Sequence, residues 1–194
     1  MKAEQSTIAD FRQTDILTAK LDTHDLVFSS IKRGFSGLEQ QIPRNATGMT
    51  HSRLERTQEL VGVLKMADGL KAEMSDVAKK LYSSDELSEN LVKKAGEVKG
   101  RLKAFEKKLE QFTENTSKFV IRLRQWAHEG RQHGMRESDI QEISLNASKI
   151  GAGCKAAVEN VAAISRNWER NVMSAQKVFQ DKTDEINRSS GIDT

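Results

Sequence analysis

The chain has 194 residues, of which 37% are hydrophobic, 30% charged and 5% aromatic, with one proline and one cysteine. A net charge of +3 is too small to indicate nucleic-acid binding, and the single cysteine excludes an internal disulfide and a multi-cysteine metal site. No apolar run approaches the length of about 18 residues that a transmembrane helix needs.

The first predicted helix covers about residues 7–42. From Leu17 to Ile42, apolar residues recur at alternating steps of four and three, which keeps one side of an α-helix apolar. His24 interrupts this stripe with a polar side chain. Pro43 ends the helix, because proline supplies no backbone N–H and disfavours helical geometry in the residue before it.

The second predicted helix covers about residues 52–82. Ser52 and Glu55 have the spacing of a capping box, in which each side chain bonds to the backbone N–H of the other. The stripe that follows contains one three-residue slip near Ala67, and such a slip locally overwinds a supercoil. Its members are Leu60, Leu64, Ala67, Leu70, Met74, Val77 and Leu81.

The third predicted helix covers about residues 85–128, with Ser83 and Glu86 as a capping box at its start. Neither glycine nor proline separates it from the second helix, so the sequence leaves open whether the two are continuous. Its heptad pattern has no slip, which is typical of a bundle or coiled coil. The core seam consists of Leu91, Val98, Leu102, Phe105, Leu109, Phe112, Phe119, Leu123 and Trp126.

The fourth predicted helix covers about residues 138–187, after a reversal loop with two glycines and a capping box at Ser138 and Gln141. Its apolar stripe shifts phase after Trp168 and continues to Ile186. The small residues around Gly151 and Gly153 indicate close packing inside the bundle, with a hinge as the alternative. Residues 188–194 are expected to form a flexible tail.

These patterns predict an all-α fold: an elongated antiparallel four-helix bundle with coiled-coil character and a long C-terminal helical hairpin. The whole chain, residues 1–194, is expected to form one helical-bundle domain.

Basic residues are concentrated on the third predicted helix, where residues 91–136 carry 12 basic and 5 acidic side chains. One interpretation is a binding strip for an acidic partner or an anionic membrane. The other is that these side chains pair with acidic residues of neighbouring helices. The strip consists of Lys94, Arg101, Lys103, Lys107, Lys108, Arg122 and Arg124.

The sequence contains no recognisable catalytic, metal or cofactor motif. His128 and His133 are five residues apart, which is not a zinc-ligand spacing on one helix face. Cys154 has no basic residue one helical turn away and is expected to be a buried structural thiol. We therefore expect no enzymatic activity, no cofactor, no metal and no small-molecule substrate.

The function that these features favour is a non-enzymatic interaction or scaffold protein that acts through helix–helix contacts. The expected partner is another protein or a second copy of the chain. The alternative is a membrane-active bundle, of effector or pore-forming type, that reaches anionic lipid through the basic strip. Nucleic acid is disfavoured as a partner. A cytoplasmic location is expected, because the N-terminus shows no signal-peptide run, although export by another route stays open.

Overall fold

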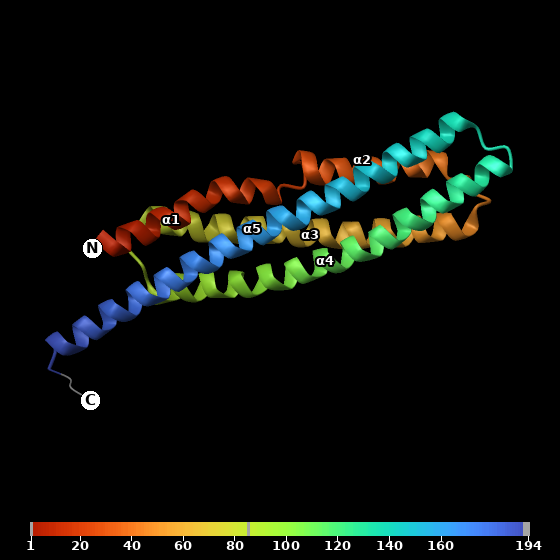
Figure 1. Ribbon diagram of the computed structural model, residues 1–194. Coiled ribbons are helices and arrows are strands. Elements are labelled where there is room, and N and C mark those ends of the chain that lie inside the picture. The colour runs from red at the N-terminus through yellow and green to blue at the C-terminus, as the bar shows by residue number, and fades with distance from the viewer. Residues whose placement is uncertain (1, 85, 192–194) are drawn as a thin grey trace. The chain divides into compact units, whose positions relative to one another are not determined.

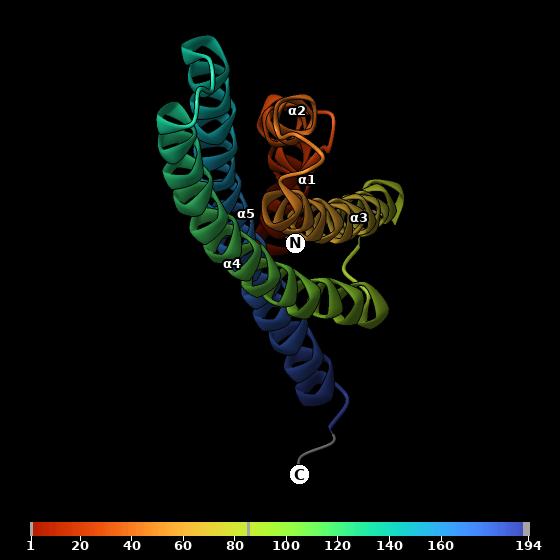
Figure 2. The same ribbon diagram turned by 90° about the vertical axis from the view of Figure 1, so that its right-hand side faces the viewer.

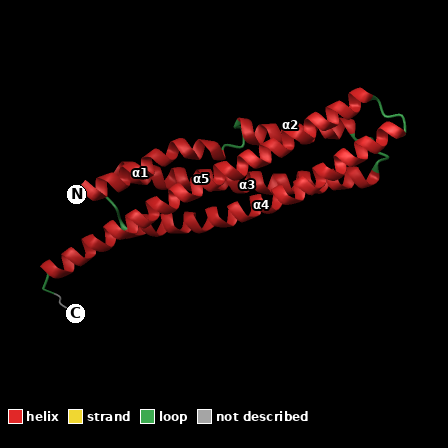
Figure 3. Cartoon of the chain, viewed as in Figure 1, coloured by secondary structure: helices red, strands yellow, loops and turns green. Residues whose placement is uncertain are grey.

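The computed structural model describes residues 2–84 and 86–191, which are almost entirely helical and contain no strand (Figures 1 and 3). This confirms the predicted all-α helical bundle. The elements are α1 (Lys2–Thr18), the 3-10 turn η1 (Ala19–Leu21), α2 (Leu26–Gln41), α3 (Thr47–Ser84), α4 (Glu89–Gln132) and α5 (Glu137–Ser189).

The chain packs as two compact units. Unit 1 contains α1, the second part of α3, the first part of α4 and the second part of α5; its ranges are Met1–Leu21, Gly69–Ala104 and Val161–Thr194. Unit 2 contains α2 and the remaining parts of α3, α4 and α5, in Asp22–Asp68 and Phe105–Asn160. Since three helices run through both units, the single domain expected over residues 1–194 stays a prediction.

The prediction of one helix over residues 7–42 is wrong, because residues 19–25 separate α1 from α2. The Asp22 carboxylate accepts a hydrogen bond from the His24 backbone N–H at 2.9 Å, and the Thr23 hydroxyl donates to Asp68 at 3.1 Å. Polar side chains that bond locally compete with the helical backbone bonds. The polar position at His24 therefore marks a break, and the side chain of Leu17 lies outside the described part of the structure.

The three predicted capping boxes are also wrong. Ser52 and Ser83 lie inside α3, and Ser138 lies inside α5. The second and third predicted helices are not continuous: α3 ends at Ser84 and α4 begins at Glu89, while Asp85 lies outside the described residues. The Ser88 hydroxyl caps α4 by accepting a hydrogen bond from the Leu91 N–H at 3.3 Å.

The buried stripe of α3 differs from the predicted one at a single position. Val63 is fully buried, whereas Leu64 is only half-buried. With Val63 in the stripe, the steps from Leu60 to Leu81 alternate between three and four, so the slip predicted near Ala67 does not occur. Leu64 therefore lies outside the buried stripe, on a neighbouring face of α3.

Eight of the nine predicted seam residues of α4 are buried; only Trp126 is half-buried. The adjacent Ala127 is buried in its place, because the last step of the stripe, from Leu123, is four residues. On α5 the stripe stays buried through Val172 and Ala175, but Ile186 is exposed, so the core ends before the helix does.

Unit 1 is centred on Trp168, whose side chain is fully buried. Its indole N–H donates a hydrogen bond to the Ala95 carbonyl at 2.9 Å, and its ring lies nearly perpendicular to that of Phe11, with the ring centroids 5.1 Å apart. The indole therefore joins α5 to α4 and to α1, with its one polar atom satisfied.

Several hydrogen bonds join α1 to α5. The hydroxyls of Thr7 and Ser174 lie 3.0 Å apart, and the Thr14 hydroxyl donates to Asn167 at 3.4 Å. The amide of Asn171 donates to the Asp10 carbonyl and to Thr14. In the described part of α1 only Ile8 and Phe11 add large buried apolar side chains. Hydrogen bonds thus add to the contact of Phe11 with Trp168 between α1 and α5.

Glu4 anchors the start of α1 in unit 1, and its replacement by glutamine should make stability less dependent on pH. Its carboxylate accepts a hydrogen bond from the Leu87 N–H at 2.9 Å, which lowers the Glu4 pKa below its usual 4.5, and Lys182 lowers it further. A lowered pKa stabilises the fold above about pH 4.5, and the effect is lost as the pH falls through the lowered value. Urea titrations should therefore give a higher free energy of unfolding for wild type than for Glu4→Gln at pH 7, and similar values in acid. A difference that does not change with pH would contradict the stabilising role of the Glu4 carboxylate.

In unit 2, α2 and α5 approach closely because glycines line their contact. A Cβ atom on Gly34 would lie 2.5 Å from Ile150 Cγ1, and one on Gly153 would lie 2.5 Å from Ile31 Cγ1. Both distances are too short for real atoms, so only glycine permits this packing. The Phe35 and Phe119 rings stack alongside, at a centroid distance of 6.1 Å.

The hairpin between α4 and α5 lies in unit 2, where the two helices run side by side in both views (Figures 1 and 2). The N–H groups of His133 and Met135 donate to the Gly130 carbonyl at 3.0 and 2.9 Å. Gly134 has a φ of 86°, a left-handed conformation that glycine adopts without strain. The predicted reversal loop thus ends α4 through its glycines.

Candidate interaction surface

A hollow of about 210 Å³ lies between α2 and α3 in unit 2; we call it the α2–α3 groove. Phe35 and Leu60, both buried, form its floor. The full lining comprises Lys32, Phe35, Ser36, Glu39, Arg53, Thr57, Leu60, Val61 and Leu64. The groove is open to solvent and largely apolar, with charged side chains at its border.

The α3 side of the groove carries a second apolar stripe. Leu54, Thr57, Val61 and Leu64 follow one another at steps of three, four and three, so they share one face of the helix. Leu54 is 46% exposed and Val61 is 47% exposed. This stripe has the spacing of a helix-packing surface, yet within the described residues it is only partly covered.

The charges around the groove are mostly positive. Arg53 is 8% exposed, and its nearest carboxylate is that of Glu39, 3.8 Å from Arg53 Nη2 on a side chain that is itself exposed. Lys32 lines the groove from α2, and Lys65 follows Val61 by one turn of α3. At 3.8 Å the guanidinium and the carboxylate attract each other without a hydrogen bond.

In unit 1, residues of the basic strip meet acidic neighbours, as the pairing interpretation predicted. Arg101 forms an ion pair with Glu73 of α3, and Lys103 lies 3.3 Å from Glu169 of α5. Lys94 lines a hollow of about 220 Å³ together with Glu73 and Asp76. These cations are therefore largely balanced within the unit.

In unit 2 the residues of the basic strip make fewer contacts with acidic side chains. The Arg124 guanidinium donates to the Ser148 hydroxyl at 3.1 Å. Lys107, Lys108 and Arg122 are exposed, and among the described residues they form no ion pair. The seven residues of the strip thus divide between the units: Lys94, Arg101 and Lys103 lie in unit 1 and the other four in unit 2.

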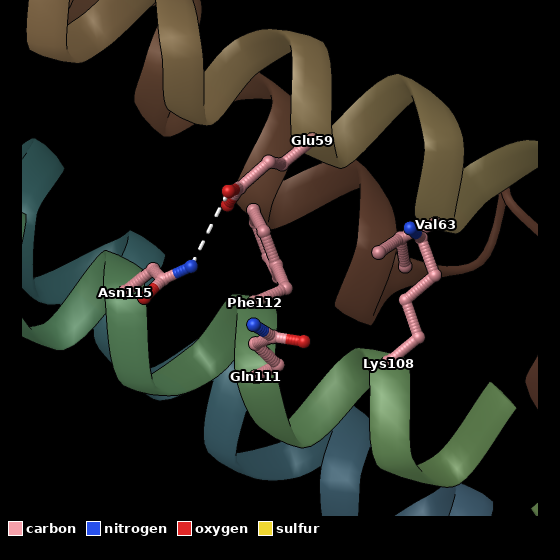
Figure 4. A pocket seen from close by; sticks show the side chains of 6 residues that line it. All are labelled: Glu59, Val63, Lys108, Gln111, Phe112 and Asn115. Atoms are coloured by element: carbon pink, nitrogen blue, oxygen red, sulfur yellow. Dashed lines mark hydrogen bonds between the residues drawn. The ribbon is translucent and has the colours of Figure 1, made fainter. Parts of the chain in front are cut away.

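A second hollow of unit 2, of about 190 Å³, lies between α3 and α4 (Figure 4). Phe112 and Val63 supply its apolar wall, and Asn115 donates a hydrogen bond to Glu59 at 3.3 Å. Glu59 also pairs with Arg56 at 3.1 Å. Apart from this ion pair, Glu59 Oε2 is buried without a hydrogen-bond partner, so the polar groups of this hollow are only partly satisfied.

Cys154 lies in the core of unit 2, where burial raises the pKa of its thiol to about 12. The thiolate is the reactive form, so the folded protein should not react with a thiol reagent such as iodoacetamide at pH 8. Urea should expose the thiol, so the alkylated fraction measured by mass spectrometry should rise with the unfolded fraction. Rapid alkylation without denaturant would show that the core around Cys154 opens readily.

Within residues 2–84 and 86–191, no group of three potential metal-ligating side chains is found. None of the described helices is both long and apolar enough to cross a membrane.

The α2–α3 groove was not predicted from the sequence. One clue was present: Val61, Val63 and Leu64 are all apolar, so one helix turn contains more apolar residues than a single stripe can use. A surplus of this kind marks a second apolar face.

The fold and this surface define the chain as an all-α helical-bundle protein with a partly covered apolar groove. No protein-family model matches it, and no similar protein was found among curated proteins or solved structures.

Proposed function

We propose that the chain is a non-enzymatic interaction protein that acts through helix–helix contacts, with another protein or with a second copy of itself. The observation that supports this proposal is the α2–α3 groove, where Val61 and Leu64 lie beside the core stripe of α3 rather than within it. Apolar side chains at helical spacing on a surface are the usual features of a helix-binding site.

The test compares wild type with Val61→Arg, a change at an exposed position that should leave folding intact. Light scattering over a wide range of concentration reports self-association, and affinity capture from a lysate of the source reports other partners. The proposal predicts that the substitution abolishes one of the two. A concentration-independent monomer that captures no protein in either form would contradict it.

Binding to anionic membranes is a second candidate, for which the exposed cations of α4 in unit 2 are the supporting observation. Ile121, 66% exposed, directly precedes Arg122, and Lys107 and Lys108 lie further back along the same helix. An apolar side chain beside cations suits a lipid surface. Flotation with vesicles that contain phosphatidylserine tests this function, and absence of binding at low salt would exclude it.

A further inference from the structure

The α2–α3 groove is suited to one additional helix. The steps from Leu54 through Val61 to Leu64 match those of the core stripe on the neighbouring face of the same helix. Helices pack by placing side chains at such spacing into the grooves of a neighbour. An incoming helix with apolar residues at positions i, i+3, i+4 and i+7 would therefore continue the packing of unit 2 outward.

Arg53 indicates that the incoming helix carries negative charge beside its apolar stripe. Its side chain is largely buried at the border of the groove, yet its guanidinium makes no hydrogen bond among the described residues. A guanidinium binds a carboxylate best through two parallel hydrogen bonds, and Glu39 at 3.8 Å provides neither. Lys32 adds a second positive charge to the lining of the groove. Lys65 and Asp68, which carry opposite charges, both lie outside this lining.

We propose that the α2–α3 groove binds an amphipathic helix of a partner protein, whose apolar stripe packs on Val61 and Leu64 and whose flanking carboxylates meet Arg53 and Lys32. This inference rests on the proposed function and adds the chemistry of the partner. Charge complementarity selects acidic flanks, because a basic flank would place like charges against Arg53 and Lys32, which both line the groove.

The experiment uses the full chain and two designed helical peptides of about 18 residues with the same leucine stripe. One peptide carries glutamate on both flanks and the other carries lysine. Fluorescence anisotropy measures the binding of each to wild type, to Val61→Arg and to Lys32→Glu. Ile121→Arg, at an equally exposed apolar position of unit 2, is the matched control, and circular dichroism confirms that every variant is folded.

The glutamate peptide is expected to bind wild type at least about tenfold more tightly than the lysine peptide. Val61→Arg should abolish the binding of both peptides. Lys32→Glu should reduce the ratio of the two affinities, and Ile121→Arg should change neither the affinities nor their ratio. Equal binding of both peptides, or binding that survives Val61→Arg, would overturn the inference. If neither peptide binds while light scattering shows self-association that Val61→Arg removes, the occupant is a second copy: the inference falls and the proposed function stands.

Discussion

Replacement of Gly153 by leucine is expected to lower the free energy of unfolding by about 3 kcal/mol, whereas Gly151→Ala should raise it by up to about 1 kcal/mol. The two glycines are two residues apart in sequence but face different surroundings. A Cβ on Gly153 would lie 2.5 Å from Ile31 Cγ1 and 3.3 Å from the Val27 carbonyl. A Cβ on Gly151 would have nothing within 4 Å. Side chains at Gly153 must therefore push α2 away from α5, while alanine at Gly151 only improves helix propensity.

Urea titration monitored by circular dichroism measures both effects. Gly153→Ala should fall between the two variants, because its propensity gain opposes a single misplaced methyl group. If Gly151→Ala raises the free energy of unfolding and Gly153→Leu lowers it, Gly153 has a packing role and the two glycines do not act together as a hinge. A stabilising Gly153→Leu would contradict the close contact of α2 with α5.

Replacement of Trp168 by alanine should destabilise unit 1 by about 3–5 kcal/mol. The substitution empties the centre of the unit and leaves the Ala95 carbonyl without its hydrogen-bond donor. Trp168→Phe retains most of the apolar volume and removes the same hydrogen bond, so it should lower stability by only about 1–2 kcal/mol.

The two tryptophans make this measurement specific to each unit. Trp168 lies in unit 1 and Trp126 in unit 2, so fluorescence of the Trp168→Ala variant follows unit 2 alone. Comparison with circular dichroism then shows whether unit 1 unfolds at lower denaturant. Coincident transitions at the wild-type midpoint would contradict a central role for Trp168.

The regular parts of the fold were predictable because one periodic pattern dominated them. Between Phe105 and Phe112 no seam position has a large apolar neighbour in the sequence, so only one phase of the helix buries the apolar stripe. Around Val63 and Leu64 two adjacent apolar residues allow two phases, and only the position of α2 decides between them. Serine followed three residues later by glutamate or glutamine occurs by chance in a polar chain, which explains the three wrongly predicted capping boxes.

The candidate surface depended on neighbours that no local pattern identifies. The heptad positions predict that the basic strip lies beside the seam. They do not predict that Glu73 and Glu169 form ion pairs with part of the strip. The α2–α3 groove depends on where α2 lies beside α3, and α2 begins as a separate helix after residues 22–25. The sequence pattern predicts a continuous helix through that segment, so it does not predict the groove.

The polar contact between α1 and α5 has a consequence for the specificity of folding. An interface of leucines can slide by one turn and still exclude water, because apolar contacts are not directional. A one-turn shift of α1 would instead separate Thr7 from Ser174 and leave the buried amide of Asn171 without its acceptors. A shifted register would thus leave buried polar groups without hydrogen bonds, so these contacts favour a single register of α1 on α5.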